Sequence, residues 1–241
     1  MSGDVPTRTG SATAVVFARM TSSRLPGKVL ADIGGTPLLA LLVERLVHCA
    51  AVSDVVVATS TTAADDPVAA AAHGLGVACH RGPLDDVAAR AVAAAALVGA
   101  DRFFRANGDS PFLPVELYAG AIEQFDATDA DVVSNVSPRR FPPGASVELV
   151  RTATLERALA DMTAEEAEHV TLHLYRHADQ YRIVPLDVEP PEDRSESARL
   201  VVDTAEDLER ARSMAGLAAG PLEGLSLAEL LALHDAAGIP A

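Results

Sequence analysis

The feature that most restricts the fold of this chain is a regular alternation along the sequence. Short apolar runs rich in valine, alanine and phenylalanine are followed repeatedly by longer stretches with helical periodicity. Such alternation is typical of βαβ units, which assemble a mostly parallel sheet. The sequence therefore predicts an α/β fold of the Rossmann-like type, with a mostly parallel central sheet flanked by helices.

The individual elements are predicted from the β-type runs and from the amphipathic stretches. Strands are predicted at residues 13–18, 54–59, 77–80, 101–105, 131–134, 147–150, 181–185 and 199–202. Helices are predicted at residues 37–49, 66–73, 87–98, 114–125, 152–160, 164–177, 204–214 and 227–236. Pro114 is expected in the first turn of its helix, where its missing N–H costs no hydrogen bond.

The 241 residues divide into three predicted parts. Residues 1–12 are expected to form a disordered tail, and residues 13–215 a single domain large enough for a sizeable core. Residues 216–241 are expected to form a C-terminal helical extension. Ser226 and Glu229 have the spacing of a capping box before its helix. This helix is expected to pack on the core or on a second subunit.

The formal net charge of −15 argues against nucleic acid and anionic membrane surfaces as partners. Against this acidic background, Arg19, Arg24 and Lys28 form a local cluster of positive charge, for which a small anion is the simplest ligand. Cys49 and Cys79 are expected to be free thiols in a reducing compartment. The first residues lack the apolar segment of a signal peptide, and no apolar run is long enough to span a bilayer. The sequence therefore predicts a cytoplasmic protein.

The positive cluster directly follows the first predicted strand, where open α/β sheets bind ligands. The segment from Arg19 to Lys28 supplies two arginines, one lysine, three hydroxyl groups and Gly27, which permits close approach of the backbone. A triphosphate needs such cations and donors. The alternative is a solvated basic turn.

Two aspartates end other predicted strands. Asp109 follows the fourth strand, and Asp203 follows the run at residues 199–202. Mg²⁺ is usually held by one or two carboxylates together with phosphate oxygens and waters. Asp109 and Asp203 are therefore the predicted metal ligands. The alternatives are an Asx turn at Asp109 and a helix N-cap at Asp203.

Several motifs occur in the order found in a known family. The opening is Ala18-Arg19, then Ser22-Ser23-Arg24-Leu25-Pro26-Gly27-Lys28 and Ile33-Gly34-Gly35-Thr36-Pro37-Leu38. Later motifs are Val57-Ala58-Thr59, Arg81-Gly82 with Asp85-Asp86-Val87 and Arg90, Gly108-Asp109-Ser110-Pro111, Asp131 to Asn135, Gly144 to Glu148, Glu168-His169-Val170-Thr171, and Val202-Asp203-Thr204 with Asp207-Leu208. Over residues 13–212 the chain resembles the cytidylyltransferase family, which includes CMP-Kdo synthetases and, as the closer branch, spore-coat-polysaccharide cytidylyltransferases.

The resemblance implies a nucleotide-diphospho-sugar-transferase-like fold, a nucleotidyltransferase domain over residues 13–215, and a homodimer. It also implies CTP as donor and Mg²⁺ held by Asp109 and Asp203. Arg19, Arg24 and Lys28 are the predicted catalytic residues around the triphosphate. The predicted substrate-binding residues are Ser22, Ser23, Gly27, Thr59, Arg81, Asn107, Arg139, Arg140, Glu148, Glu168 and His169.

Some of these residues have a second interpretation. Arg139 and Arg140 either clamp an acceptor carboxylate, phosphate or phosphonate, or form a solvent-exposed pair. Glu168 and His169 are expected on the continuous helix 164–177, where a purely structural role is the alternative. His173 and His177 stand four residues apart, but no carboxylate has a spacing that supports a zinc site, so we predict none there.

The sequence thus leads to one functional hypothesis. A Mg²⁺-dependent enzyme moves CMP from CTP to a small anionic acceptor, and pyrophosphate leaves after in-line attack on the α-phosphorus. Sugar acids, other sugars and phosphonates remain open as acceptors, because residues 141–145 depart from the pattern of the branch. The alternatives are a nucleotide-sugar glycosyltransferase on the same fold and an inert nucleotide-binding regulator. The basic loop disfavours the first, and the presence of Lys28 and both aspartates disfavours the second.

Overall fold

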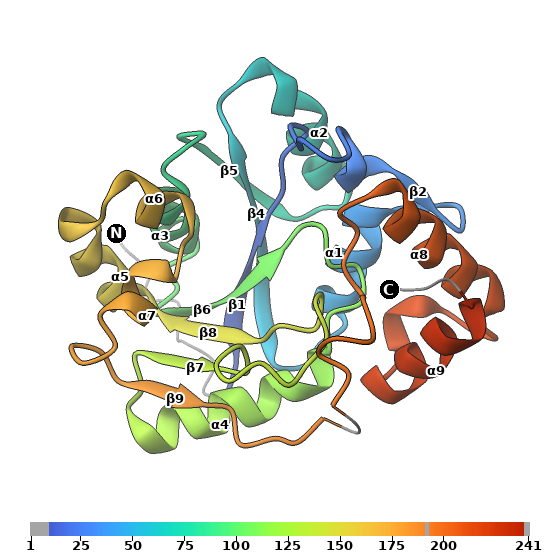
Figure 1. Cartoon of the computed structure of the whole chain (residues 1–241). Helices are drawn as coiled ribbons and strands as arrows, with labels where there is room; N and C mark the ends of the chain where they lie inside the picture. Colours follow the sequence, from blue (N-terminus) through green and yellow to red (C-terminus); the bar gives the residue numbers. More distant parts are fainter. Residues whose placement is uncertain (1–9, 191–192, 239–241) are drawn as a thin grey trace.

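The structure is a computed structural model that describes residues 10–190 and 193–238. Most of the tail predicted over residues 1–12 lies outside this range, and the first strand begins at Ala12. Across the described residues, the chain forms one central sheet with helices on both faces (Figure 1).

The central sheet has seven strands in the order β5-β4-β1-β6-β8-β7-β9. All its strand pairs are parallel except those that β8 makes with β6 and β7. The mostly parallel α/β sheet predicted from the sequence is therefore confirmed. The strands are β1 (Ala12–Phe17), β4 (Val52–Ser60), β5 (Ala78–Gly82), β6 (Arg102–Asn107), β7 (Val132–Ser134), β8 (Glu148–Arg151) and β9 (Ile183–Pro185).

The central strand β1 is buried because helices cover both faces of the sheet. Val15 and Val16 are fully buried and point to opposite faces, as successive residues of a strand must. On the face of Val16 lie α1 (Leu38–Val47), α2 (Asp66–Gly74) and α4 (Tyr118–Thr128). On the face of Val15 lie α3 (Val87–Leu97), α5 (Thr152–Ala158), α6 (Ala164–Glu168) and α7 (Leu172–Arg176).

The last part of the chain forms α8 (Ala205–Leu217) and α9 (Leu227–Ala237), which pack against each other. The capping box of α9 is present, with Ser226 and Glu229 bonded reciprocally. The buried Arg45 guanidinium of α1 donates to the carbonyl oxygens of Leu222 (2.6 Å) and Leu225 (2.8 Å). Leu227, Leu230 and Leu231 of α9 are buried in one cluster with Leu38 and Leu41 of α1, so of the two packing sites left open by the sequence, this helix takes the core of its own chain.

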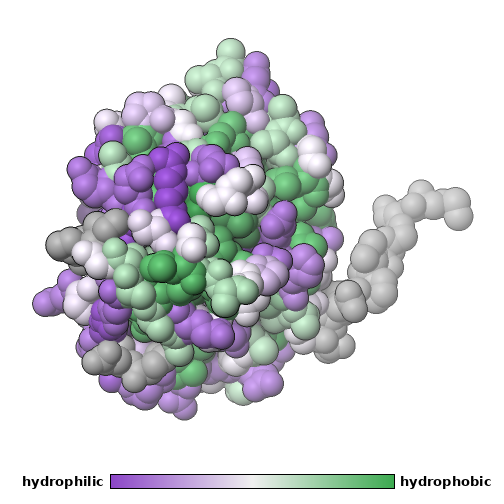
Figure 2. Space-filling model, turned by 90° about the vertical axis from the view of Figure 1, so that its right-hand side faces the viewer, coloured by the Kyte–Doolittle hydropathy of each residue, from purple (hydrophilic) through white to green (hydrophobic). Residues whose placement is uncertain are grey.

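Figure 2 views the molecule from the side on which Figure 1 draws α8 and α9. Apolar side chains remain visible there between hydrophilic ones, and Leu217 at the end of α8 is 51% exposed. In the part of the chain that the structure describes, no helix combines the length and the apolar character needed to cross a bilayer.

Four details of the predicted elements are wrong. Residues 199–202 form no strand, because Leu200 N–H and Val202 N–H donate to two irregular segments, at Pro143 O and Asp109 O (both 2.8 Å), instead of to a neighbouring strand. The helix predicted over 164–177 is broken between α6 and α7, since His169 has non-helical torsion angles (φ −116°, ψ 76°).

The other two details concern short elements. A hairpin of β2 (Asp32–Ile33) and β3 (Thr36–Pro37) was not predicted; it turns through Gly34 and Gly35, both at positive φ. Pro114 lies just before a 3₁₀ turn, Val115–Leu117, that leads into α4, so it precedes the first turn instead of lying within it. Further 3₁₀ turns are Lys28–Leu30, Ala63–Asp65, Leu159–Asp161 and Leu222–Gly224.

Candidate active site

The candidate site lies at the edge where β1, β4 and β6 end. Phe17 pairs with Ala58 on one side and with Asn107 on the other, so the carboxyl ends of three parallel strands meet. Gly108 N–H donates to Phe17 O (2.8 Å). A Cβ at Gly108 would lie 2.5 Å from Phe17 O, so only glycine permits this close approach. Asp109 is thereby placed directly beside the start of the basic loop.

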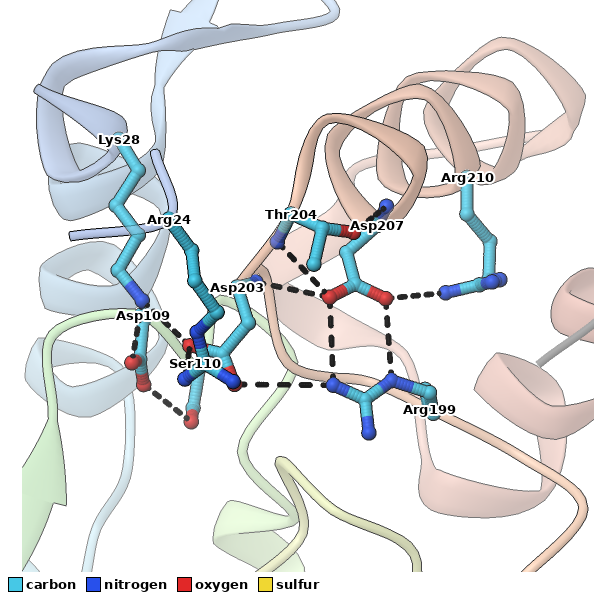
Figure 3. A network of polar contacts seen from close by, with 9 residues as sticks. All are labelled: Arg24, Lys28, Asp109, Ser110, Arg199, Asp203, Thr204, Asp207 and Arg210. Carbon is cyan, nitrogen blue, oxygen red and sulfur yellow. Dashed lines mark hydrogen bonds and ion pairs between the residues drawn. The ribbon is translucent and has the colours of Figure 1, made fainter. Parts of the chain in front are cut away.

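The basic loop folds Lys28 into a site between the two predicted metal ligands (Figure 3). Lys28 Nζ lies 2.8 Å from Asp109 Oδ2 and 2.7 Å from Asp203 Oδ1, and Lys28 is only 8% exposed. Arg24 Nη2 is 3.0 Å from the same oxygen of Asp203, but the Arg24 side chain is 62% exposed. Gly27, at φ +76°, makes the turn that precedes Lys28. The structure thus brings together two carboxylates from different strand ends with two cations of the loop.

Asp203 is held in place by Asp207, one turn into α8 (Figure 3). Asp207 Oδ2 accepts hydrogen bonds from the backbone N–H groups of Asp203 (3.0 Å) and Thr204 (3.1 Å). The N-cap of α8 is Thr204, so the alternative of Asp203 as a helix N-cap is wrong and its carboxylate faces Lys28 instead. Burial raises the pKa of Asp207, but hydrogen bonds from Arg199, Asp203 N–H and Arg210 outweigh burial and lower it to about 2.

A second buried carboxylate, Asp65, anchors the basic loop. Asp65 is fully buried, and its Oδ1 accepts from Met20 N–H (2.7 Å), while Oδ2 accepts from Ser60 N–H (3.3 Å) and from the Ser60 hydroxyl. The loop after β1 is therefore tied to the end of β4. The sequence analysis missed Asp65, since a single carboxylate between two strands carries no spacing signal.

A cavity of about 170 Å³ opens at this edge of the sheet. It is lined by Phe17, Ala18, Arg19, Val87, Arg90, Arg105, Asn107, Glu168, His169 and Val170. Arg90 is 3% exposed, and its Nε has no hydrogen-bond partner in the part of the chain that the structure describes. Burial and the neighbouring Arg19 lower the pKa of Arg90. Three guanidinium groups at one cavity, those of Arg19, Arg90 and Arg105, favour an anionic ligand.

Glu148 does not line this cavity but holds a residue that does. It is 2% exposed and ion-paired with Arg105, and it accepts hydrogen bonds from Thr171 Oγ1 (2.9 Å) and the Tyr175 hydroxyl (3.0 Å). Arg105 was missed by the sequence analysis. The only signal was a charged residue near the end of the apolar strand that contains Phe103 and Phe104.

The remaining predicted residues lie around or outside this cluster. Ser22 Oγ accepts from Leu25 N–H (3.4 Å) within the loop, and Ser23 is exposed there. Thr59 is fully buried in β4. Arg81 donates to Ser60 O (2.9 Å) and Thr62 O (2.8 Å) and pairs with Asp66 (2.7 Å).

Arg139 and Arg140 are exposed on the loop after β7. Arg140 forms an ion pair with Glu189 and lines a different hollow of about 490 Å³, together with Ser134 and Asn135. Neither arginine is among the residues that line the cavity at the sheet edge.

Together, these features define a nucleotidyltransferase-type α/β enzyme with its site at the carboxyl edge of the sheet. Residues 13–229 match the model of the family described as cytidylyltransferase. The chain belongs to the cytidylyltransferase family. It is therefore a CTP-dependent nucleotidyltransferase and not the glycosyltransferase kept as the alternative.

Individual relatives agree with this assignment. The chain is 33% identical over 227 residues to the spore coat polysaccharide biosynthesis protein SpsF of Bacillus subtilis, covering 91% of this chain and 92% of that protein. It is 30% identical to a 3-deoxy-manno-octulosonate cytidylyltransferase of Mesorhizobium japonicum, covering 83% and 97%. The structure of a cytidylyltransferase from Leptospira borgpetersenii superposes with a TM-score of 0.86 at 26% identity, covering 93% of each chain.

Proposed function

We propose that this enzyme transfers CMP from CTP to a small anionic acceptor in a Mg²⁺-dependent reaction that releases pyrophosphate. The observation that carries the proposal is the convergence of Asp109 and Asp203 on Lys28, at the same sheet edge as the arginine-lined cavity. The family supports the cytidylyl donor. The acceptor class is inferred from the charge of the cavity.

The two carboxylates fit a divalent cation. Both already lie within hydrogen-bond distance of one cationic atom, Lys28 Nζ, so a small cation of higher charge suits the same position. One or two carboxylates with phosphate oxygens are the usual ligands of Mg²⁺. When bound, Mg²⁺ would polarise the phosphoryl group and neutralise part of its developing charge. Asp109 and Asp203 would hold it.

Lys28 and Arg24 would have a second role when a divalent cation is bound. With a divalent cation neutralising the two aspartates, the Lys28 ammonium would be able to turn toward the phosphates, where it would stabilise the charge that develops on the leaving pyrophosphate. Arg24, whose side chain is mostly exposed, is free to swing onto the same oxygens. No covalent enzyme intermediate is needed, because phosphoryl transfer depends mainly on positioning and charge stabilisation.

The acceptor is proposed to bind in the cavity between β1 and the α6–α7 segment. Arg105 and Arg90 attract its negative charge, while Glu168 and His169, which also line the cavity, are available for hydrogen bonds to hydroxyl groups. A sugar acid offers both a carboxylate and hydroxyls, and therefore matches this lining better than a neutral sugar does.

The test measures pyrophosphate release with Mg²⁺, each of the four NTPs and a panel of sugar acids, neutral sugars and phosphonates. Acceptor-dependent release with CTP alone is expected. Asp109→Asn and Asp203→Asn should each reduce turnover at least about 100-fold. Asp129→Asn is the matched control, because Asp129 pairs with Arg151 next to the start of β7 and is 88% exposed. Equal turnover in the control and the two site variants would refute the proposed roles.

The expected homodimer and cytoplasmic location belong to this proposal as well. Size-exclusion chromatography with light scattering measures the first, and fractionation of the native host measures the second. A monomer at assay concentration with full turnover would remove the dimer from the proposal.

A further inference from the structure

The break between α6 and α7 creates a cluster of three side chains that a continuous helix would keep apart. In an unbroken helix, Glu166 and His173 would be about 10 Å apart along the axis. In the structure the chain turns at His169, and Glu166 Oε2 lies 3.3 Å from His173 Nδ1 while Glu166 Oε1 lies 3.7 Å from His177 Nε2. The carboxylate that the sequence spacing did not supply thus reaches both histidines.

One end of the cluster is buried, and the other end is open to solvent. Glu166 and His173 are each 3% exposed, whereas the His177 side chain is 41% exposed. The backbone N–H and the hydroxyl of Thr163 donate to Glu166 Oε2 (2.9 and 3.0 Å). These bonds fix the direction of the carboxylate, and one of the two histidines can be reached from solvent.

We propose that Glu166, His173 and His177 bind one divalent transition-metal ion of the Zn²⁺ type. The carboxylate and imidazole ligand atoms all lie within 4.8 Å of one another. Two imidazole nitrogens and one carboxylate oxygen, with a fourth position open to water, form a ligand set that Zn²⁺ accepts readily. Mg²⁺ prefers oxygen ligands alone, so this site differs in metal class from the pair of aspartates.

One cationic side chain, that of Arg176, lies beside the proposed metal ligands. Arg176 Nη1 lies 3.7 Å from Glu166 Oε1, but both its terminal nitrogens are bound by Glu165 (2.9 Å each). Glu165 neutralises this guanidinium, and the Arg176 side chain is 43% exposed, so it can turn into solvent. In the metal-free protein His173 Nδ1–H donates to Glu166. For Nδ1 to bind a metal, the neutral ring takes its other tautomer, with the single proton on Nε2.

The position of the cluster gives such a metal a structural task. Figure 1 shows α6 and α7 on the side of the molecule opposite α8 and α9. The turn between α6 and α7 carries His169 into the active-site cavity, and α7 carries Tyr175 to Glu148. A metal that links Glu166 on α6 to the histidines of α7 would fix this turn. The inference concerns metal binding itself and does not depend on the identity of the acceptor.

The test is calorimetric titration of Zn²⁺ into the untagged full-length protein after removal of metal with a chelator. The Asp109→Asn/Asp203→Asn double variant serves as background, so that the catalytic carboxylates do not contribute. One Zn²⁺ per chain is expected in this background. His177→Ala, at a position whose side chain is 41% exposed, should weaken binding at least about tenfold. His48→Ala, an exposed histidine bonded to Glu44 O, is the matched control and should bind as the background does.

Two further results would support or overturn the proposed metal site. Cobalt(II) substituted for zinc should show visible absorption bands of nitrogen-ligated tetrahedral metal, and His177→Ala should abolish them. No zinc uptake by the background protein, or uptake that His177→Ala leaves unchanged, would overturn the proposal.

Discussion

Replacing Asp207 by asparagine tests how much a buried charge outside the cavity contributes to the stability of the fold around Asp203, a metal-ligand candidate. The Asp207 carboxylate is 3% exposed. It accepts from the N–H groups of Asp203 and Thr204, from Arg199 Nε (3.1 Å) and from Arg210 Nη1 (2.7 Å). Asparagine keeps the shape of the side chain but removes its charge and turns an NH₂ group toward one set of donors. The variant therefore isolates the electrostatic part of this contact.

The magnitude follows from the pKa of Asp207. Lowering the pKa from 3.8 to about 2 corresponds to about 2 kcal/mol of stabilisation at neutral pH, at about 1.4 kcal/mol per unit. Because the pKa of this acid is lower in the folded state, the stabilisation is complete above the unfolded-state pKa. It is lost as the pH falls from about 4 through the folded-state value near 2.

The assay is urea unfolding of wild type and Asp207→Asn at several pH values between 7 and 3. A difference in unfolding free energy of about 2 kcal/mol is expected at pH 7, shrinking below about pH 4. Asp235→Asn is the control. The pKa of Asp235 is also lowered to about 2 through Arg194, but its side chain is 55% exposed, so solvent screening should limit the cost to about 1 kcal/mol or less. Equal losses in the two variants, or a loss independent of pH, would refute the reasoning.

Two other substitutions have defined outcomes. Lys28→Met removes the ammonium between Asp109 and Asp203. The affinity for Mn²⁺ without nucleotide, measured by electron paramagnetic resonance, should rise at least about tenfold, while turnover should fall at least about 100-fold. Unchanged metal affinity would show that Lys28 does not compete for this position. Gly144→Ala should lower the free energy of unfolding by more than about 1 kcal/mol, because Gly144 has φ +96° and a Cβ would lie 2.3 Å from the carbonyl carbon of Leu200. Gly220→Ala, with open space around its Cβ, is the control, and a similar loss in both would contradict the steric argument.

The predictions from sequence were wrong at segments whose conformation is set by tertiary contacts, because such contacts leave no local pattern in the sequence. Residues 199–202 have the composition of a strand, yet Val202 N–H bonds to the loop carrying Asp109. The 164–177 segment has helical periodicity, yet it breaks at His169, and Thr171 in the break bonds Glu148. In both places, tertiary contacts outweigh local propensity, which differs by only about 1 kcal/mol or less per residue.

The sequence by itself determined most of the order of strands and helices, the mostly parallel character of the sheet and the candidate phosphate-binding loop. These depend on residue type and periodicity over short windows, and the loop from Arg19 to Lys28 is contiguous. Only the tertiary structure decided that Lys28 lies between Asp109 and Asp203, which are 81 and 175 positions away from it. It likewise decided that Glu148 holds Arg105 and that Glu166 faces two histidines. Contacts of this kind arise from strand order and chain reversal, which bring together side chains whose separation along the chain carries no signal.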